Sequence, residues 1–233
     1  MTIKVIVFDL DDTLFDELDY VRSGLRHTAA VLAEKFRWDP EDTERQLITS
    51  LGVSRDNIFD RVLTQKGVLS DELVKFCVET YRSHWPNIRL SNRVKRQLKQ
   101  LAENYPLYIV TDGHGGVQKT KLEVLGLLNS DFIKFCYATD DWGQDFVKPS
   151  PKCFFDIAEK EACQPGEIVY IADNPDKDFV GIKPEGFRTV RIMSGQHKDK
   201  APGIEYEADK QVADVFEAIS YVTSLSENND HEV

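Results

Sequence analysis

The start of the chain carries the pattern that most restricts its possible folds. Ile3–Phe8 is largely apolar and β-branched, and the aspartates Asp9, Asp11 and Asp12 follow at once. Such a run predicts a strand buried on both faces, as in a parallel sheet covered by helices. Carboxylates directly after the run lie at the carboxyl end of the strand, where open α/β sheets bind their ligands.

Further runs of this kind recur along the chain, with helical periodicity between them. The predicted strands are Leu107–Val110, Ile168–Ala172 and Thr189–Met193, with Phe135–Thr139 as a weaker candidate. The predicted helices are Val94–Ala102, Gln118–Leu125 with Gly126 as a C-cap, and a helix with Ser150 as N-cap and Pro151 as its first residue. Strands alternating with helices predict an α/β fold with a doubly wound parallel sheet.

One long segment interrupts this alternation. Between about Asp16 and Trp85 only helical periodicity occurs, clearest over Glu17–Phe36, Glu41–Leu51 and Asp71–His84. This is too long for one crossover and indicates an inserted α-helical domain, with hinges near Phe15–Glu17 and Pro86–Ser91. We therefore expect a discontinuous core of residues 1–15 and 90–225, a helical domain of residues 16–89, and a disordered tail over residues 226–233.

Charge and cysteine content exclude several classes of protein. The net charge of −11 leaves no basic surface for a nucleic acid. No apolar segment is long enough to span a membrane. The four cysteines lack the spacing of a zinc site and fit reduced thiols: Cys77, Cys136, Cys153 and Cys163. We expect a cytoplasmic protein that binds neither nucleic acid nor a membrane.

Polar clusters stand where the predicted strands end. They are Asp9–Thr13 (DLDDT), Thr111-Asp112-Gly113, Lys148-Pro149, and Asp173 with Asp178 in the segment DNPDKD. The carboxyl ends of parallel strands share one edge of the sheet, so these clusters can meet in one crevice. In this order and spacing they resemble the haloacid dehalogenase superfamily, in its phosphatase branch with a helical cap. The resemblance covers about residues 1–195 and implies that the inserted helices form a lid.

The first two aspartates suit phosphoryl transfer. Asp9 can attack phosphorus and form an aspartyl-phosphate, which splits one difficult hydrolysis into two easier steps. Asp11 lies on the same side of an extended segment, where it can protonate the leaving oxygen and later take a proton from water. By resemblance, true dehalogenases lack an aspartate at this second position, so Asp11 favours phosphoryl chemistry. Asp12 fits a turn or capping residue.

A carboxylate that approaches a phosphate dianion needs a cation, because two unit charges 4 Å apart repel by about 4 kcal/mol at an effective dielectric constant of 20. Mg²⁺ suits a site with few carboxylates and a phosphate. The resemblance implies that Asp9, the backbone carbonyl of Asp11 and Asp173 hold it, and that Asp178 binds through water or orients a ligand.

The remaining expected residues bind the phosphoryl group. The resemblance implies that Thr111 donates its hydroxyl and that backbone N–H groups nearby, at Asp112 and Gly113, assist. Lys148 would neutralise charge on Asp9 and on the transferring group. Two positions depart from the family pattern, since Asp112 stands where asparagine is common and Ala172 where glycine is common. The added carboxylate bears on substrate choice or metal affinity.

The sequence therefore predicts a Mg²⁺-dependent phosphatase of a small phosphorylated metabolite, such as a sugar phosphate or a nucleoside monophosphate. One alternative is a phosphosugar mutase of the same superfamily, which shares every core residue named above. Another is a phosphoacceptor signalling domain, which also uses Asp, Thr, Lys and Mg²⁺; its shorter length and lack of an acid like Asp11 weigh against it. A binding protein without catalysis is the third.

Overall fold

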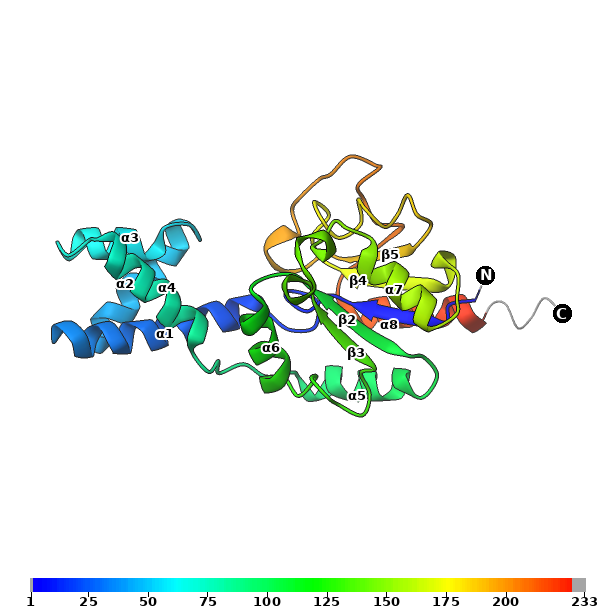
Figure 1. The fold of residues 1–233 in the computed structure, drawn as a ribbon, viewed down its shortest axis with the longest axis horizontal. Helices are drawn as coiled ribbons and strands as arrows, with labels where there is room; N and C mark the ends of the chain where they lie inside the picture. The colour runs from blue at the N-terminus through cyan, green and yellow to red at the C-terminus, as the bar shows by residue number, and fades with distance from the viewer. Residues whose placement is uncertain (1, 228–233) are drawn as a thin grey trace. The chain divides into compact units, whose positions relative to one another are not determined.

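The structure is a computed structural model that describes residues 2–227. The chain divides into two compact units. Leu18–Ile88 form a helical unit, and the described residues on either side of this segment form an α/β unit (Figure 1).

The α/β unit is built on a parallel sheet, which confirms the predicted fold class. Within the described residues the sheet has six strands in the order β3-β2-β1-β4-β5-β6. They are β1 (Val5–Phe8), β2 (Leu107–Thr111), β3 (Phe135–Ala138), β4 (Ile168–Ala172), β5 (Arg188–Ile192) and β6 (Lys210–Val212), all paired in parallel. The strand order reverses at β1, and a crevice forms at such a point beyond the carboxyl ends of the strands.

Helices of the α/β unit pack against this sheet. They are α5 (Asn92–Ala102), α6 (Gly115–Val124), α7 (Lys152–Lys160) and α8 (Val215–Glu227) (Figure 1). Val5 and Val7 of β1 share a buried cluster with Phe154 and Ile157 of α7. Alternate residues along a strand point to the same face, so α7 covers the face of the sheet that Val5 and Val7 occupy. A fully buried β1 holds the residues that follow it in a fixed place.

The helical unit has its own core. It contains α1 (Glu17–Phe36, of which Glu17 belongs to the α/β unit), α2 (Pro40–Val53), α3 (Ile58–Gln65) and α4 (Asp71–Ser83). Leu25 and Leu32 of α1 lie in one buried cluster with Leu47 of α2, Leu63 of α3 and Cys77 of α4. Residues at such helical spacing form an apolar stripe that needs a partner helix to cover it.

Side-chain caps start two of these helices. The Asp39 carboxylate accepts a hydrogen bond of 2.7 Å from the Asp42 N–H, and the Ser70 hydroxyl accepts one of 3.2 Å from the Leu73 N–H. Such caps satisfy backbone donors that have no partner within the helix.

Several elements differ from the prediction. α3, β6 and α8 were not predicted, and β5 begins and ends one residue before the expected strand. Pro151 occupies the N-cap position of α7 rather than its first turn, and the Ser150 hydroxyl accepts a hydrogen bond of 3.3 Å from the Lys152 N–H. α8 extends into the expected tail, whose residues 228–233 lie outside the described part of the chain.

The four cysteines are free thiols, and three of them are buried. Among residues 2–227, no helix combines the length and the apolar character that crossing a membrane requires.

Candidate active site

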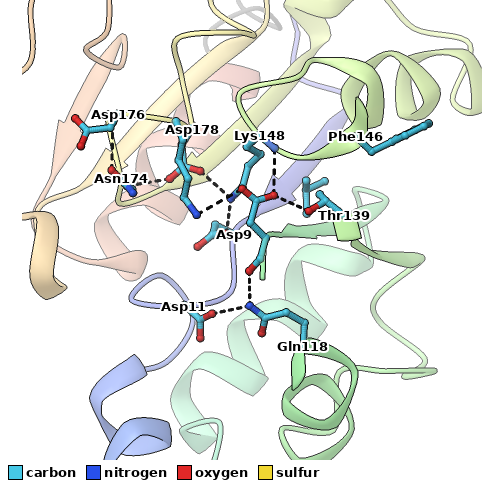
Figure 2. Close-up of polar contacts among 12 residues, drawn as sticks. Asp9, Asp11, Gln118, Thr139, Phe146, Lys148, Asn174, Asp176 and Asp178 are labelled. Carbon is cyan, nitrogen blue, oxygen red and sulfur yellow. Dashed lines mark hydrogen bonds and ion pairs between the residues drawn. The ribbon is translucent and has the colours of Figure 1, made fainter. Parts of the chain in front are cut away.

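The predicted polar clusters meet at the carboxyl ends of the central strands. Asp9 follows β1, Thr111 ends β2, and Asp173 follows β4, which neighbours β1 on the side away from β2. Lys148 comes from the segment before α7, and Asp178 follows Asp173 in the loop after β4. All five side chains are buried. Figure 2 shows Asp9, Lys148 and Asp178 pointing toward one another.

Lys148 links two of the carboxylates. Its Nζ lies 2.7 Å from Asp9 Oδ1 and 2.7 Å from Asp178 Oδ1, and the Lys148 side chain is 1% exposed. Burial lowers the pKa of Lys148, but the Asp178 and Asp9 carboxylates outweigh it and hold the pKa well above its ordinary value. Lys148 therefore stays a cation next to Asp9.

Tyr170 supports this lysine from inside the sheet. It belongs to β4, is fully buried, and its hydroxyl accepts a hydrogen bond of 2.9 Å from Lys148 Nζ. The same hydroxyl lies 3.3 Å from Asp178 Oδ1 and from the Val110 carbonyl oxygen. We did not predict this role; the signal was a tyrosine in an otherwise aliphatic strand, since a buried hydroxyl requires a partner.

Burial perturbs the carboxyl groups of Asp9 and Asp173. It raises the pKa of Asp9 to about 6, although the neighbouring Lys148 opposes the change. It raises the pKa of Asp173 to about 8, and the negative charges of Asp9 and Asp178 add to the effect. Asp173 Oδ2 is buried and has no hydrogen-bond partner among the described residues. The site thus holds more buried negative charge than its own cations neutralise, which is an environment that a bound cation would stabilise.

The residues present fit a magnesium ion of the predicted kind. No group of three His, Cys, Asp or Glu side chains in residues 2–227 is placed to hold a metal on its own. The predicted ligands need only two carboxylates, from Asp9 and Asp173, because the third is the backbone carbonyl of Asp11. Asp178 is engaged elsewhere, with Lys148 and with the Asn174 N–H at 2.9 Å, so it suits an orienting residue better than a direct ligand.

The Asp11 carboxylate is bound by two side chains of α6. Lys121 Nζ lies 2.8 Å from Asp11 Oδ1 and 2.9 Å from Oδ2. The Gln118 side-chain amide donates to Asp11 Oδ2 at 2.9 Å (Figure 2). Both partners are buried. We predicted the helix that carries them but not their contact with Asp11.

The Asp112 carboxylate contacts three residues from other segments of the chain. Its Oδ1 accepts hydrogen bonds from the Thr139 hydroxyl at 2.6 Å and from the Lys148 N–H at 3.2 Å, while Oδ2 lies 3.6 Å from Lys177 Nζ. The unusual carboxylate therefore helps to place the backbone of Lys148. The next residue, Gly113, has φ +127° and lies so close to the Gln118 amide that a Cβ would meet it at 2.9 Å.

Asp12 has the turn and capping role that we expected. Its φ is +55°, and its carboxylate accepts hydrogen bonds from the Glu17 N–H at 3.0 Å and from the Gln196 N–H at 3.1 Å. Glu17 is the first residue of α1, and Gln196 lies in the loop after β5. Gly195 packs directly on Asp12, since a Cβ there would lie 2.4 Å from Asp12 Cγ.

The comparison with protein families agrees with this geometry. The model of the haloacid dehalogenase-like hydrolases matches residues 6–192, which include every predicted site residue. The chain belongs to the haloacid dehalogenase-like hydrolase family. The predicted resemblance is therefore confirmed, and the chain is a hydrolase of this family.

Individual relatives carry names of phosphatases. The glyceraldehyde 3-phosphate phosphatase of Methanopyrus kandleri is 29% identical over 209 residues, covering 86% of this chain and 88% of the relative. The human N-acylneuraminate-9-phosphatase is 22% identical over 205 residues, covering 81% of each chain. The solved structure of the hydrolase YfnB from Bacillus subtilis, with bound magnesium, has a TM-score of 0.67 at 20% identity and covers 95% of this chain and 99% of its own. At that identity the likeness supports the fold alone.

Proposed function

We propose that this hydrolase is a Mg²⁺-dependent phosphatase of small phosphate monoesters, with Asp9 as the nucleophile. The observation that carries the proposal is the buried contact between Lys148 and Asp9 at the carboxyl end of β1. A buried cation beside a carboxylate keeps a nucleophile ionised and offsets the charge of an incoming phosphate. The phosphatase names of the relatives support the same reaction.

In the first step, an Asp9 carboxylate oxygen forms a bond to phosphorus, and the bond between phosphorus and the ester oxygen breaks. Asp11 gives its proton to that departing oxygen, so the alcohol leaves neutral. In the second step, the oxygen of a water molecule forms a bond to phosphorus, Asp11 takes a proton from that water, and the bond between phosphorus and the Asp9 oxygen breaks. Inorganic phosphate leaves and Asp9 is regenerated.

The other residues stabilise charge. Lys148 neutralises the transferring group, and Thr111 donates its hydroxyl to a phosphoryl oxygen, with backbone N–H groups at Asp112 and Gly113. Asp9, the Asp11 carbonyl and Asp173 would hold Mg²⁺, with Asp178 orienting Lys148. When bound, Mg²⁺ supplies positive charge between Asp9 and the phosphoryl group. The buried, unpartnered oxygen of Asp173 supports this assignment.

We infer that the substrate is a small phosphorylated metabolite of the sugar-phosphate type. The names of the relatives favour this class over nucleoside monophosphates. We assign the choice of leaving group to the helical unit Leu18–Ile88, acting as a cap. The free cysteines support a cytoplasmic location.

Release of inorganic phosphate from a panel of phosphorylated metabolites tests the proposal. We expect release that depends on Mg²⁺ and that disappears in Asp9→Asn. Asp131→Asn is the matched control, because Asp131 is an exposed aspartate of the same unit. Activity that persists in Asp9→Asn, or in EDTA, would reject the mechanism. A sugar phosphate that isomerises without phosphate release would instead indicate a mutase.

A further inference from the structure

We propose that Lys121 and Gln118 are positioning residues that hold the Asp11 carboxylate for its acid and base steps. The inference rests on the proposed function, because it assigns supports to the residue that we place as acid and base. It follows from the contacts that the Asp11 carboxylate makes with two side chains of α6.

Lys121 contacts both oxygens of the Asp11 carboxylate. Its Nζ lies 2.8 Å from Asp11 Oδ1 and 2.9 Å from Asp11 Oδ2. The Lys121 side chain is 3% exposed and that of Asp11 is 20% exposed. A charge-assisted contact shielded from water is stronger than a surface ion pair, so Lys121 restrains the Asp11 carboxylate more strongly than an exposed lysine would.

Gln118 makes a third contact with the Asp11 carboxylate and also binds the loop after β2. Its amide nitrogen donates to Asp11 Oδ2 at 2.9 Å and also to the Asp112 carbonyl oxygen. Gly113 lets the amide approach, because a Cβ at that position would meet the Gln118 nitrogen. The segments after β1 and β2 are therefore joined through one side chain.

Both donors stand on one rigid element. Gln118 and Lys121 are three residues apart on α6 and so share one helix face. The start of α6 is fastened by a hydrogen bond of 3.2 Å from the Gly115 N–H to the Asp140 carboxylate. An aspartate side chain has two rotatable torsions, and contacts to both oxygens from a fixed helix restrict both of them.

The consequence for catalysis depends on the leaving group. An alkyl alcohol is a poor leaving group and needs a proton from Asp11, whereas an acidic phenol leaves with little protonation. Loss of the contacts with Lys121 and Gln118 should therefore slow the first step for alkyl esters. It should spare the first step of aryl esters and slow only the attack of water.

The test compares Lys121→Met with wild type on an alkyl phosphate and on p-nitrophenyl phosphate. We expect at least a tenfold fall in kcat for the alkyl ester, as positioned acid–base catalysis contributes about 10²–10⁴-fold. With p-nitrophenyl phosphate, the rate of the initial burst of released phenol should stay within about threefold of the wild-type rate, while the phosphoenzyme accumulates. Lys121→Arg should restore part of the alkyl activity, and Gln118→Met should give a weaker defect of the same kind. Lys119→Met, an exposed lysine of the same helix, is the control and should change neither substrate.

A uniform loss on both esters, or no loss on either, would overturn the positioning role while leaving the phosphatase proposal intact.

The ion pair between Lys121 and Asp11 can also be tested without measuring turnover. In lysine-¹⁵N NMR of the metal-free protein, the Lys121 ammonium signal, assigned by its absence in Lys121→Met, should be protected from solvent exchange. Protection should be lost in Asp11→Asn and kept in Asp131→Asn. Unchanged protection in Asp11→Asn would overturn the inference even if no substrate is turned over. Wild-type protein that releases no phosphate from either ester would reject the proposed function.

Discussion

Lys148 Nζ lies 2.7 Å from Asp9 Oδ1, and both side chains are almost fully excluded from water. Removing the lysine from such a buried pair has two consequences. Catalysis loses a cation beside the nucleophile, and the fold retains buried carboxylates without their partner, which commonly costs about 3–5 kcal/mol.

Lys148→Ala should therefore lower turnover of every substrate, because the transferring phosphoryl group is common to all of them. We expect a loss of at least about a hundredfold on an aryl phosphate, the scale of one electrostatic group in an active site. Steady-state kinetics with Mg²⁺ measure it, and Lys152→Ala, at an exposed lysine nearby, serves as control. Turnover within about twofold of wild type would contradict the role of Lys148.

Mg²⁺ should stabilise the folded protein, because the buried carboxylates of Asp9 and Asp173 repel each other without it. Binding only to the folded state adds about 2.7 kcal/mol at a hundredfold excess over Kd, or roughly 5–10 °C in Tm for a chain of this size. Thermal melts in Mg²⁺ and in EDTA measure the shift. Asp173→Asn should shrink it, and an equal shift in that variant would place the ion elsewhere.

Without metal, stability should fall as the pH rises from about 4 to 8. Asp9 and Asp173 have pKa values of about 6 and about 8 in the folded protein, against 3.8 as the ordinary value. The folded state therefore binds protons more tightly, so its stability is greatest below the ordinary pKa and is lost as the pH passes the folded values. Urea unfolding in EDTA at pH 5 and pH 8 should differ by on the order of a few kcal/mol more in wild type than in Asp173→Asn. Equal pH dependence in the two proteins would show that Asp173 does not titrate in this way.

Asp9→Ala should abolish turnover and any covalent intermediate, whereas Asp11→Asn should trap the intermediate. With an aryl phosphate, the first step survives in part and the second loses its base, so phosphate remains on Asp9. Intact-protein mass spectrometry after an acid quench should show the added phosphate, and peptide mapping should place it on Asp9. A phosphate found on another residue would remove Asp9 as nucleophile. Normal turnover of Asp11→Asn would remove Asp11 as acid and base.

Asp112→Asn should be mild, because an amide oxygen can accept the same hydrogen bonds from Thr139 and Lys148. Only the charge near Lys177 is lost, and at 3.6 Å this pair is weak. We expect kcat within about threefold of wild type, whereas Asp112→Leu should fall much further because both buried donors lose their acceptor. Equal damage from the two substitutions would mean that the charge of Asp112 itself matters.

The buried strands and the residues at their ends could be predicted because the signal is local. β4 coincides with its prediction, and Asp9 follows β1 as expected. An apolar run and the polar residue that ends it are adjacent in sequence, and parallel strands bring such ends together without further information. β6 was missed because it is short and only one of its three residues is buried, so its alternation is too brief to detect.

The supports of the site could not be predicted because their partners are distant in sequence. Lys121 stands 110 residues after Asp11, and Tyr170 lies 22 residues after Lys148. Helical periodicity locates α6, but it does not say which charged side chain of the helix is buried. A buried lysine becomes visible only when the carboxylate that pairs with it is placed in space.

The packing of Gly195 on Asp12 limits which substitutions relatives of this chain can accept at these two positions. Residue 195 has φ +69°, and any side chain there would collide with the Asp12 carboxylate. That carboxylate fastens both the start of α1 and the loop after β5. A lineage that keeps Asp12 is therefore bound to glycine at position 195, whereas one that loses Asp12 escapes the collision and keeps only the preference of the positive φ for glycine. In an alignment of relatives, aspartate at position 12 should therefore occur together with glycine at position 195, although the two positions are separated by most of the chain.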